Sequence, residues 1–180
     1  MAPWTFLKIA LAYTVGAYVV DVVAKPSVIA ARARAAADAR GKPLLNVGCG
    51  MPGSSLRVAL LGPTGWGNVN CDLAAPSECS SDGAACHCDA QALPFPDKFF
   101  GAAIASHVLE HVADPNAAIR ELHRVADEVF VITPAWWAPH TYLHPGHRWL
   151  VTPSGRYLPL WDEAAEAHGP ELPAASATVT

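Results

Sequence analysis

The sequence predicts a doubly wound α/β fold, with a mostly parallel sheet of about five strands behind an apolar N-terminal helix. Between residues 44 and 133, short apolar runs that end in glycine or aspartate alternate with helical segments. This rhythm is typical of parallel strands joined by right-handed crossovers. The chain has 180 residues, 52% of them hydrophobic, which is enough to bury the hydrophobic core of such a domain. We divide it into an apolar helix (1–25), an α/β domain (26–160) and a flexible tail (161–180).

The first element is an apolar segment over residues 4–23, interrupted only by Lys8 and Asp21. About 20 mostly apolar residues can cross a bilayer, and charges near the ends of such a segment can reach the headgroups. We interpret residues 4–23 as a membrane anchor. Three alternatives stay open: a signal peptide, an organellar targeting segment, and a helix docked on a partner or on its own domain.

Basic residues dominate the stretch that follows, namely Lys25, Arg32, Arg34, Arg40 and Lys42. Positive charge beside a span marks its cytoplasmic side, so we expect the main domain there. Residues 26–40 are rich in alanine and predict a second helix. In this helix Pro26 suits the first position and Gly41 a stop.

The α/β domain itself begins at residue 44. We predict strands over residues 44–47, 68–71, 85–88, 100–106 and 128–133. A glycine-rich turn after the first strand leads into a helix over residues 54–61, capped by Ser54 or Ser55. A later helix starts with Asp114 as N-cap and Pro115 in its first position.

The ends of the first strands carry residue types that suit a nucleotide. Glycines at a strand-to-helix turn, here Gly48, Gly50 and Gly53, let a ligand approach the backbone closely. Asp72 stands at the tip of the second strand, where a carboxylate can hold a ribose diol. The glycines alone would also fit a nicotinamide-dependent reductase.

A longer motif favours another family. Residues 89–115 read DAQALPFPDKFFGAAIASHVLEHVADP. Together with the glycine turn and Asp72, this stretch closely resembles the class I S-adenosylmethionine-dependent methyltransferases, in the type 11-like group that acts on small molecules and lipids. The resemblance covers roughly residues 42–134 and implies a Rossmann-like sheet with S-adenosylmethionine as the cofactor.

The resemblance also implies which residues contact the methionine and ribose parts of that cofactor. Gly48 and Gly50 would lie against the methionine part, and Asp72 would accept hydrogen bonds from both ribose hydroxyls. Asn46 stands where the family usually has an acid; it can still accept a hydrogen bond from the methionine amine, but without a charge. The glycine turn, with Met51 and Pro52, is one residue longer than the commonest form.

By the same resemblance, the adenine would be held by Asp89 and the backbone of Ala90, with Leu93 in its apolar wall. Ser106 and His107 would lie beside the sulfonium and face the acceptor. A general base is needed only when the acceptor loses a proton, and His107 and His111 are the candidates. For His111 a structural role is the simpler interpretation.

No metal site is expected. His140, His144 and His147 have a spacing that could suit a metal, but no acidic or cysteine residue lies near them in the sequence. The functional interpretation of this segment is a lid on the acceptor side; the alternative is a loop packed on the sheet edge or on a partner.

Five cysteines, an odd number, do not form the even framework of a small secreted protein. In a strand over residues 85–88, Cys86 and Cys88 share one face while His87 lies on the other, which argues against a common metal. We therefore expect Cys49, Cys71, Cys79, Cys86 and Cys88 to be reduced thiols, mostly buried.

Residues 134–180 contain seven prolines and show no clear helix and strand pair, although the family normally has both there. The formal net charge of −4 gives no reason to expect nucleic-acid binding. The sequence thus predicts a membrane-associated methyltransferase for a small-molecule or lipid acceptor, on the cytoplasmic or an equivalent cofactor-containing organellar side. The alternative is a non-catalytic subunit of a membrane assembly, with contacts through the N-terminal helix and Trp136, Trp137 and Trp149.

Overall fold

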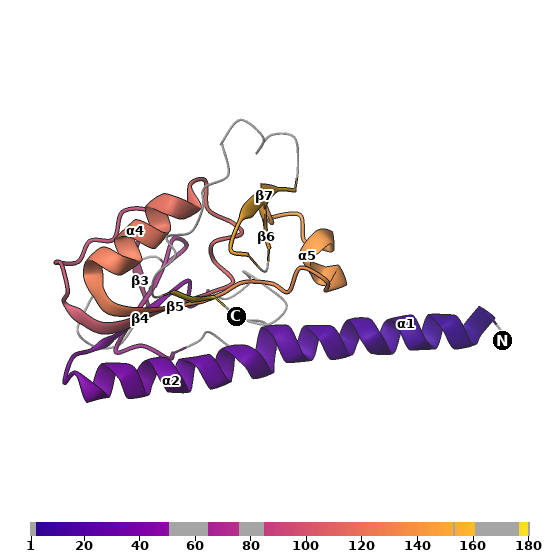
Figure 1. The fold of residues 1–180 in the computed structure, drawn as a ribbon, viewed down its shortest axis with the longest axis horizontal. Coiled ribbons are helices and arrows are strands. Elements are labelled where there is room, and N and C mark those ends of the chain that lie inside the picture. The colour runs from indigo at the N-terminus through magenta and orange to yellow at the C-terminus, as the bar shows by residue number, and fades with distance from the viewer. Residues whose placement is uncertain (1–2, 51–64, 76–84, 153, 161–176, 180) are drawn as a thin grey trace.

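The computed structural model describes residues 3–50, 65–75, 85–152, 154–160 and 177–179. Its main sheet has the strand order β3-β2-β1-β4-β5-β8, and every neighbouring pair is parallel (Figure 1). The strands are β1 Leu44–Val47, β2 Val69–Asp72, β3 Ala85–His87, β4 Phe100–Ser106, β5 Ala126–Ile132 and β8 Ala177–Val179. The predicted doubly wound, Rossmann-like sheet is confirmed. Because the chain runs outward from β1 to β3 and then returns to β4, the strand order reverses between β1 and β4, which is where such sheets bind ligands.

The central strands are buried because helices cover both faces of the sheet. All residues of β1, and all of β4 except Ser106, are buried. On one face, helix α2 (Lys25–Ala39) packs Ile29, Ala33 and Ala37 into a cluster with residues of β1, β4 and β5. On the other face, helix α4 (Pro115–Val125) contributes Ile119 and Leu122 to the second cluster.

Helix α4 starts as predicted. The Asp114 carboxylate accepts hydrogen bonds from the backbone N–H groups of Asn116 and Ala117, and Pro115 occupies the first turn. These contacts satisfy N–H groups that have no partner inside the helix. The helix expected over residues 54–61 lies outside the described residues.

The two predicted N-terminal helices form one continuous helix that projects from the body of the molecule (Figure 1). Helix α1 (Pro3–Tyr18) continues through a π-helical turn, η1 (Val19–Ala24), into α2. Asp21, expected at the headgroups, is instead only 2% exposed and contacts the domain. Its carboxylate accepts a hydrogen bond from Ala135 N at 2.7 Å and lies 3.0 Å from His140 Nε2. The π turn lies where this carboxylate reaches the domain.

The C-terminal region contains more regular structure than its prolines suggested. A short helix, α5 (Pro139–Leu143), precedes the antiparallel pair β6 (Trp149–Val151) and β7 (Tyr157–Pro159). The expectation of no helix and strand pair is therefore wrong. Its prolines are compatible with these elements, since Pro139 lies in the first turn of α5 and Pro159 ends β7. Residues 177–179 of the predicted tail form β8 beside β5.

Two other expectations need correction. Trp149 cannot anchor a partner in this fold because it is only 2% exposed, and its indole N–H donates to Val112 O. Cys71 and Cys88 are joined in a disulfide between β2 and the end of β3, and Cys86 is disulfide-bonded as well. Parallel pairing of β2 with β3 brings these cysteines close, so they are not reduced thiols. Cys79 lies outside the described residues.

Candidate functional site

A cavity of about 630 Å³ opens at the carboxyl ends of β1, β2, β3 and β4. This is the edge of the sheet where its strand order reverses, as expected for a ligand site in a doubly wound fold. Eight of the predicted site residues line it: Gly48, Gly50, Asp72, Asp89, Ala90, Ser106, His107 and His111. The topology thus brings together residues that lie up to 63 positions apart in the sequence.

The glycine turn supplies bare backbone to this cavity. Gly48 and Gly50 have φ angles of +70° and +80°, which side-chain-bearing residues rarely adopt. Gly48 N and Cys49 N both donate to Cys71 O, so the turn is held against β2. A β-carbon on Gly48 would collide with the Val108 side chain, which packs over the turn.

Asp72 and Asp89 stand at the tips of neighbouring strands. The Asp72 carboxylate accepts hydrogen bonds from Gly50 N and Ala74 N, both at 2.9 Å, one on each oxygen. Asp89 Oδ1 accepts from Gln91 N, also at 2.9 Å. The Gln91 side-chain amide also donates to Asp89, with Nε2 3.2 Å from Oδ1 and 3.4 Å from Oδ2. Asp72 keeps a lone pair on each oxygen and Asp89 keeps one on Oδ2, so both groups can still accept from a ligand. The disulfide joins Cys71 and Cys88, the residues that immediately precede the two aspartates.

The other two predicted cofactor contacts, Asn46 and Leu93, are not among the residues that line the cavity. Asn46 is buried in β1, and its amide donates to Asn70 Oδ1 in β2 at 3.0 Å. Leu93 belongs to the hydrophobic core, and its backbone N–H donates to Glu121. In this structure both residues support the site from within the domain.

His107 is held from two sides. Its Nδ1 lies 3.3 Å from a carboxylate oxygen of the fully buried Glu110, and its Nε2 lies 3.3 Å from the carbonyl oxygen of Asp21. Burial lowers the pKa of His107, but hydrogen bonding and charge interaction with Glu110 outweigh this and raise it overall. Because both ring nitrogens face acceptors, His107 is suited to be a doubly protonated hydrogen-bond donor.

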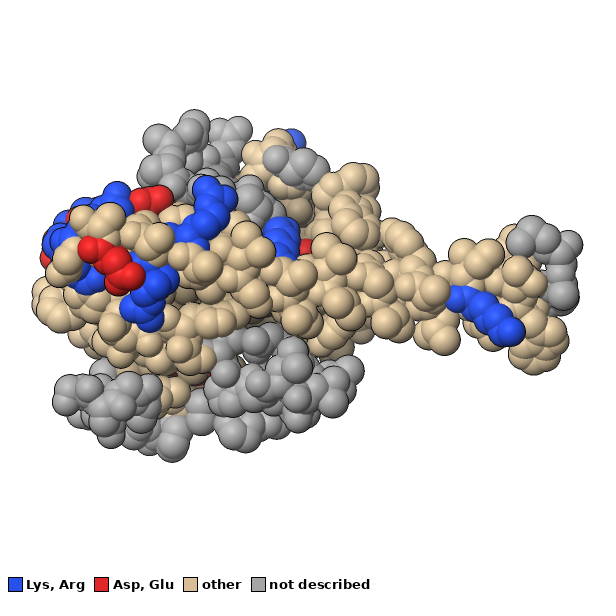
Figure 2. Space-filling model, turned by 90° about the horizontal axis from the view of Figure 1, so that it is seen from below, with Lys and Arg blue, Asp and Glu red and all other residues tan. Residues whose placement is uncertain are grey.

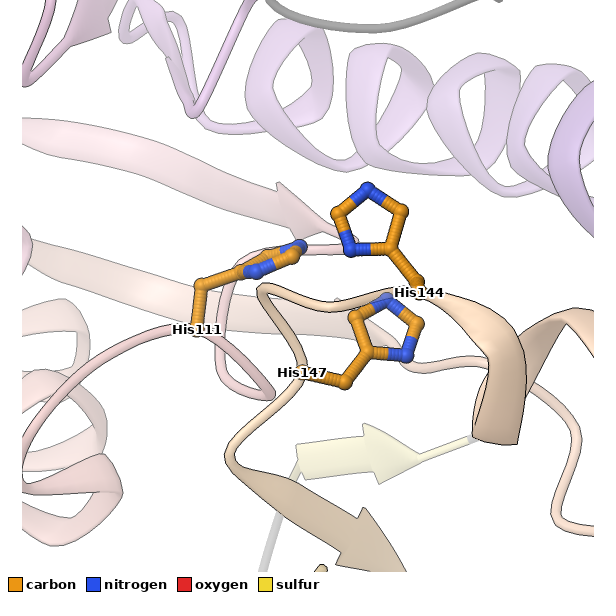
Figure 3. Close-up of side chains that lie close together, drawn as sticks. All are labelled: His111, His144 and His147. Carbon is orange, nitrogen blue, oxygen red and sulfur yellow. The ribbon is translucent and has the colours of Figure 1, made fainter. Parts of the chain in front are cut away.

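His111 also lines the cavity and contacts three residues that the sequence did not indicate. Its Nδ1–H donates to Gly146 O at 2.8 Å, and its ring packs against those of His144 and His147 (Figure 3). Sequence spacing grouped these two residues with His140, which turns away to pair with Asp21. Tyr18 and Val22 of the N-terminal helix also line the cavity, and sequence reasoning missed both.

Comparison with known proteins fits this geometry. Residues 45–128, which span β1 to the start of β5, match the family model of a methyltransferase domain. The chain carries a class I methyltransferase domain. The glycine turn and both strand-end aspartates fall inside the matched residues of this domain.

The chain is also similar to curated methyltransferases from three Xanthomonas bacteria, X. oryzae pv. oryzae, X. campestris pv. campestris and X. axonopodis pv. citri. Each is named as the ubiquinone/menaquinone biosynthesis C-methyltransferase UbiE. Each is 34% identical to this chain over 74 residues, which are 37% of the chain and 28% of the relative. The match therefore spans under a third of the length of these relatives.

Proposed function

We propose that this protein binds S-adenosylmethionine in the cavity and transfers its methyl group to a small-molecule or lipid acceptor at a membrane. The observation that carries the proposal is the convergence of the glycine turn, Asp72 and Asp89 on one cavity. Its volume of about 630 Å³ lies in the usual range for small-molecule sites, roughly 300–1,000 Å³.

The residues present fit this cofactor. Gly48 and Gly50 line the cavity with backbone, which the methionine part would approach, while the Val108 side chain fills the space beside the Gly48 α-carbon. Asp72 would accept the two ribose hydroxyls on lone pairs that Gly50 N and Ala74 N do not use. Asp89 and the Ala90 backbone would hold the adenine, and Ser106 and His107 would lie by the sulfonium.

The cofactor would supply a methyl group activated on a positively charged sulfur. The protein's part is to orient the acceptor for in-line attack, and positioning alone contributes much of such catalysis. His107 is poorly suited to act as a base, because Glu110 and the Asp21 carbonyl face its two nitrogens. His111 donates its Nδ1–H to Gly146, so its Nε2 carries the lone pair that could take an acceptor proton.

Membrane association is supported by the apolar, exposed surface of α1. Trp4 and Leu11 are 72% and 62% exposed, and one helix, Trp4–Ala39, is long and apolar enough to cross a bilayer. A signal sequence or a buried core helix can pass the same test, but α1 is exposed along most of its length. In Figure 2 the charged side chains gather over the domain, while the projecting helix is almost uncharged.

Exposed aromatic residues of the domain lie beside this helix. The Tyr13 ring lies 6.3 Å from that of Trp137, and Trp136 and Tyr142 are exposed nearby in the chain. Aromatic side chains of this kind favour the membrane–water interface. With α1 in the membrane, the basic residues of α2 would place the domain on the cytoplasmic side, or on an equivalent organellar side that contains the cofactor.

The acceptor is proposed to be lipid-soluble. The similar bacterial proteins are named for ubiquinone and menaquinone biosynthesis, and an apolar helix borders the cavity through Tyr18 and Val22. A quinone precursor is therefore the first compound to test. The alternative of a non-catalytic subunit in a membrane assembly, docked through α1 and Trp136 and Trp137, does not require a cavity lined by two strand-end carboxylates.

The test uses the full chain in lipid nanodiscs. We expect calorimetry to detect S-adenosylmethionine binding near micromolar affinity, and labelled methyl to be transferred to a quinone precursor. Ser106→Phe would fill the cavity and abolish both, whereas Ser154→Phe, on the exposed turn before β7, is the matched control. Absence of binding at millimolar cofactor would refute the enzyme and favour the subunit.

A further inference from the structure

We propose that His111, His144 and His147 form a binding site for a divalent transition-metal ion, with zinc as the best match, at the wall of the cavity. This site goes beyond the proposed methyl transfer and does not depend on it. The three side chains come from two separate segments, the loop after β4 and the loop between α5 and β6 (Figure 3).

The three imidazoles are close enough to share one ion. Each offers one ring nitrogen, and these nitrogens all lie within 4.8 Å of one another. Zinc–nitrogen bonds of roughly 2.0–2.1 Å in a tetrahedral site place the ligand nitrogens about 3.3 Å apart. The remaining difference of no more than about 1.5 Å is within reach of side-chain rotation.

Two of the rings are held by a hydrogen bond to a backbone carbonyl. His111 donates its Nδ1–H to Gly146 O, and His147 donates its Nδ1–H to Thr141 O, each at 2.8 Å. Metal-bound histidines usually donate their other ring N–H to a carbonyl or carboxylate in this way. The assignment of these protons follows from the carbonyl partners, and it leaves Nε2 of each ring as the nitrogen with a lone pair.

His144 needs a small rearrangement. Its Nδ1 accepts a hydrogen bond from Gly146 N at 3.1 Å, which binding of a metal at that nitrogen would displace. The side chain is exposed, so it can turn at little cost. Its ring already stacks on that of His147, with centroids 4.6 Å apart.

A buried carboxylate near the cluster favours a bound positive charge. Glu110, adjacent to His111 in the chain, is a fully buried acid whose charge acts on both His144 and His147. A carboxylate in that position would partly compensate the charge of a metal ion.

Three protein ligands leave one position of a tetrahedral zinc open, as in catalytic rather than structural sites. All three histidines line the cavity, so a water molecule or a small ligand could reach that position from it. If the proposed function is correct, an oxygen or sulfur atom of the acceptor could bind there. Metal binding would then use the His111 nitrogen that is otherwise available to accept a proton.

The test measures zinc binding to the full chain, free of any histidine tag and first treated with a chelator. Competition with a chromophoric chelator at pH 7.5 should show one zinc per chain, and cobalt should give the visible bands of a tetrahedral site. His111→Gln and His147→Gln should each weaken zinc binding by at least about 100-fold. Loss of a residue that only hydrogen-bonds to a metal ligand already weakens metal binding by up to about 100-fold, and loss of the ligand itself should cost no less. His87→Gln, at the exposed end of β3, is the matched control and should leave zinc affinity unchanged.

His144→Gln keeps the test decisive if either of those variants fails to fold, because its side chain is exposed. Less than half an equivalent of zinc on the folded wild-type chain would overturn the proposal, as would equal losses in the His87→Gln control. Titration with S-adenosylmethionine on the same metal-free samples separates the two hypotheses. Zinc binding without cofactor binding refutes only the proposed function, and the reverse refutes only the metal site.

Discussion

Replacing Asp72 by asparagine removes a negative charge from the cavity while almost preserving the shape of the side chain. In the wild-type structure, Gly50 N donates to one carboxylate oxygen and Ala74 N to the other. An asparagine offers one oxygen and one NH₂ group, so it can accept from only one of these two donors. The substitution therefore affects the ends of both the glycine turn and β2.

The expected loss of affinity follows from the ligand hydrogen bonds. A hydrogen bond to a charged group contributes about 1.5–3 kcal/mol, and the ribose of S-adenosylmethionine would donate two to Asp72. Loss of the charge and of one acceptor should weaken binding by about 3 kcal/mol, or roughly 150-fold in Kd. The substitution removes contacts to the ribose, which the product S-adenosylhomocysteine shares, so it should also weaken binding of that product.

Calorimetric titration of the full chain measures this change. Asp38→Asn, on the exposed end of α2, is the matched control with the same chemical change. An analogue without the 2′-hydroxyl should bind wild type more weakly, yet lose less when Asp72 is replaced, because one of the two hydrogen bonds is already gone. Binding of Asp72→Asn within twofold of wild type, with an unchanged thermal melt, would show that the ribose does not contact Asp72.

Three further substitutions or treatments test the parts that surround this group. Asp21→Asn should weaken the contact of the helix with the domain by about 2 kcal/mol and speed amide exchange at Ala135 roughly 30-fold, because that N–H loses a charged acceptor; slow exchange as in wild type would contradict this. Burial raises the pKa of the Cys49 thiol to about 11, so at pH 8 iodoacetamide should alkylate it roughly 200-fold more slowly than an ordinary thiol, as followed by mass spectrometry; labelling at the ordinary rate in the folded chain would contradict the burial. Joint replacement of Cys71 and Cys88 by serine should weaken S-adenosylmethionine binding about tenfold, or 1.4 kcal/mol, because Asp72 and Asp89 follow the bridged residues directly; unchanged affinity in calorimetry would show that the bridge does not position the two aspartates.

The sheet could be predicted from the sequence because each strand is specified locally. An apolar run closed by a glycine defines β1 and one closed by an aspartate defines β2, to within a residue or so, and the small apolar run of residues 100–106 defines β4. Helix α4 was equally clear, since Asp114 and Pro115 specify its start. The position of the cavity could also be predicted, because parallel strands bring the carboxyl ends of β1 and β2 to the same edge of the sheet.

What the sequence did not indicate depends on contacts between distant segments. Asp21 and His140 are 119 residues apart in the sequence. From the sequence alone, an aspartate near the end of an apolar segment is equally compatible with a position at the lipid headgroups. The histidine cluster joins His111 to a loop more than thirty residues later, so spacing within that loop suggested His140 as the third member. The disulfide likewise depends on the pairing of β2 with β3, which no local pattern of cysteines reveals.

The same long-range contacts make the N-terminal helix part of the site. Asp21 contacts His107 through its carbonyl oxygen and His140 through its carboxylate, and Tyr18 and Val22 line the cavity beside them. The composition of the sequence suggests a boundary between residues 25 and 26, but this boundary would separate the N-terminal helix from the domain that it contacts. A chain shortened to residues 26–180 would lack one wall of the cavity and the acceptor for the His107 Nε2–H. Tyr18, which lines the cavity, is the last residue of α1, so the apolar surface of α1 begins beside the cavity. Any contact of α1 with a membrane would therefore lie close to the cavity.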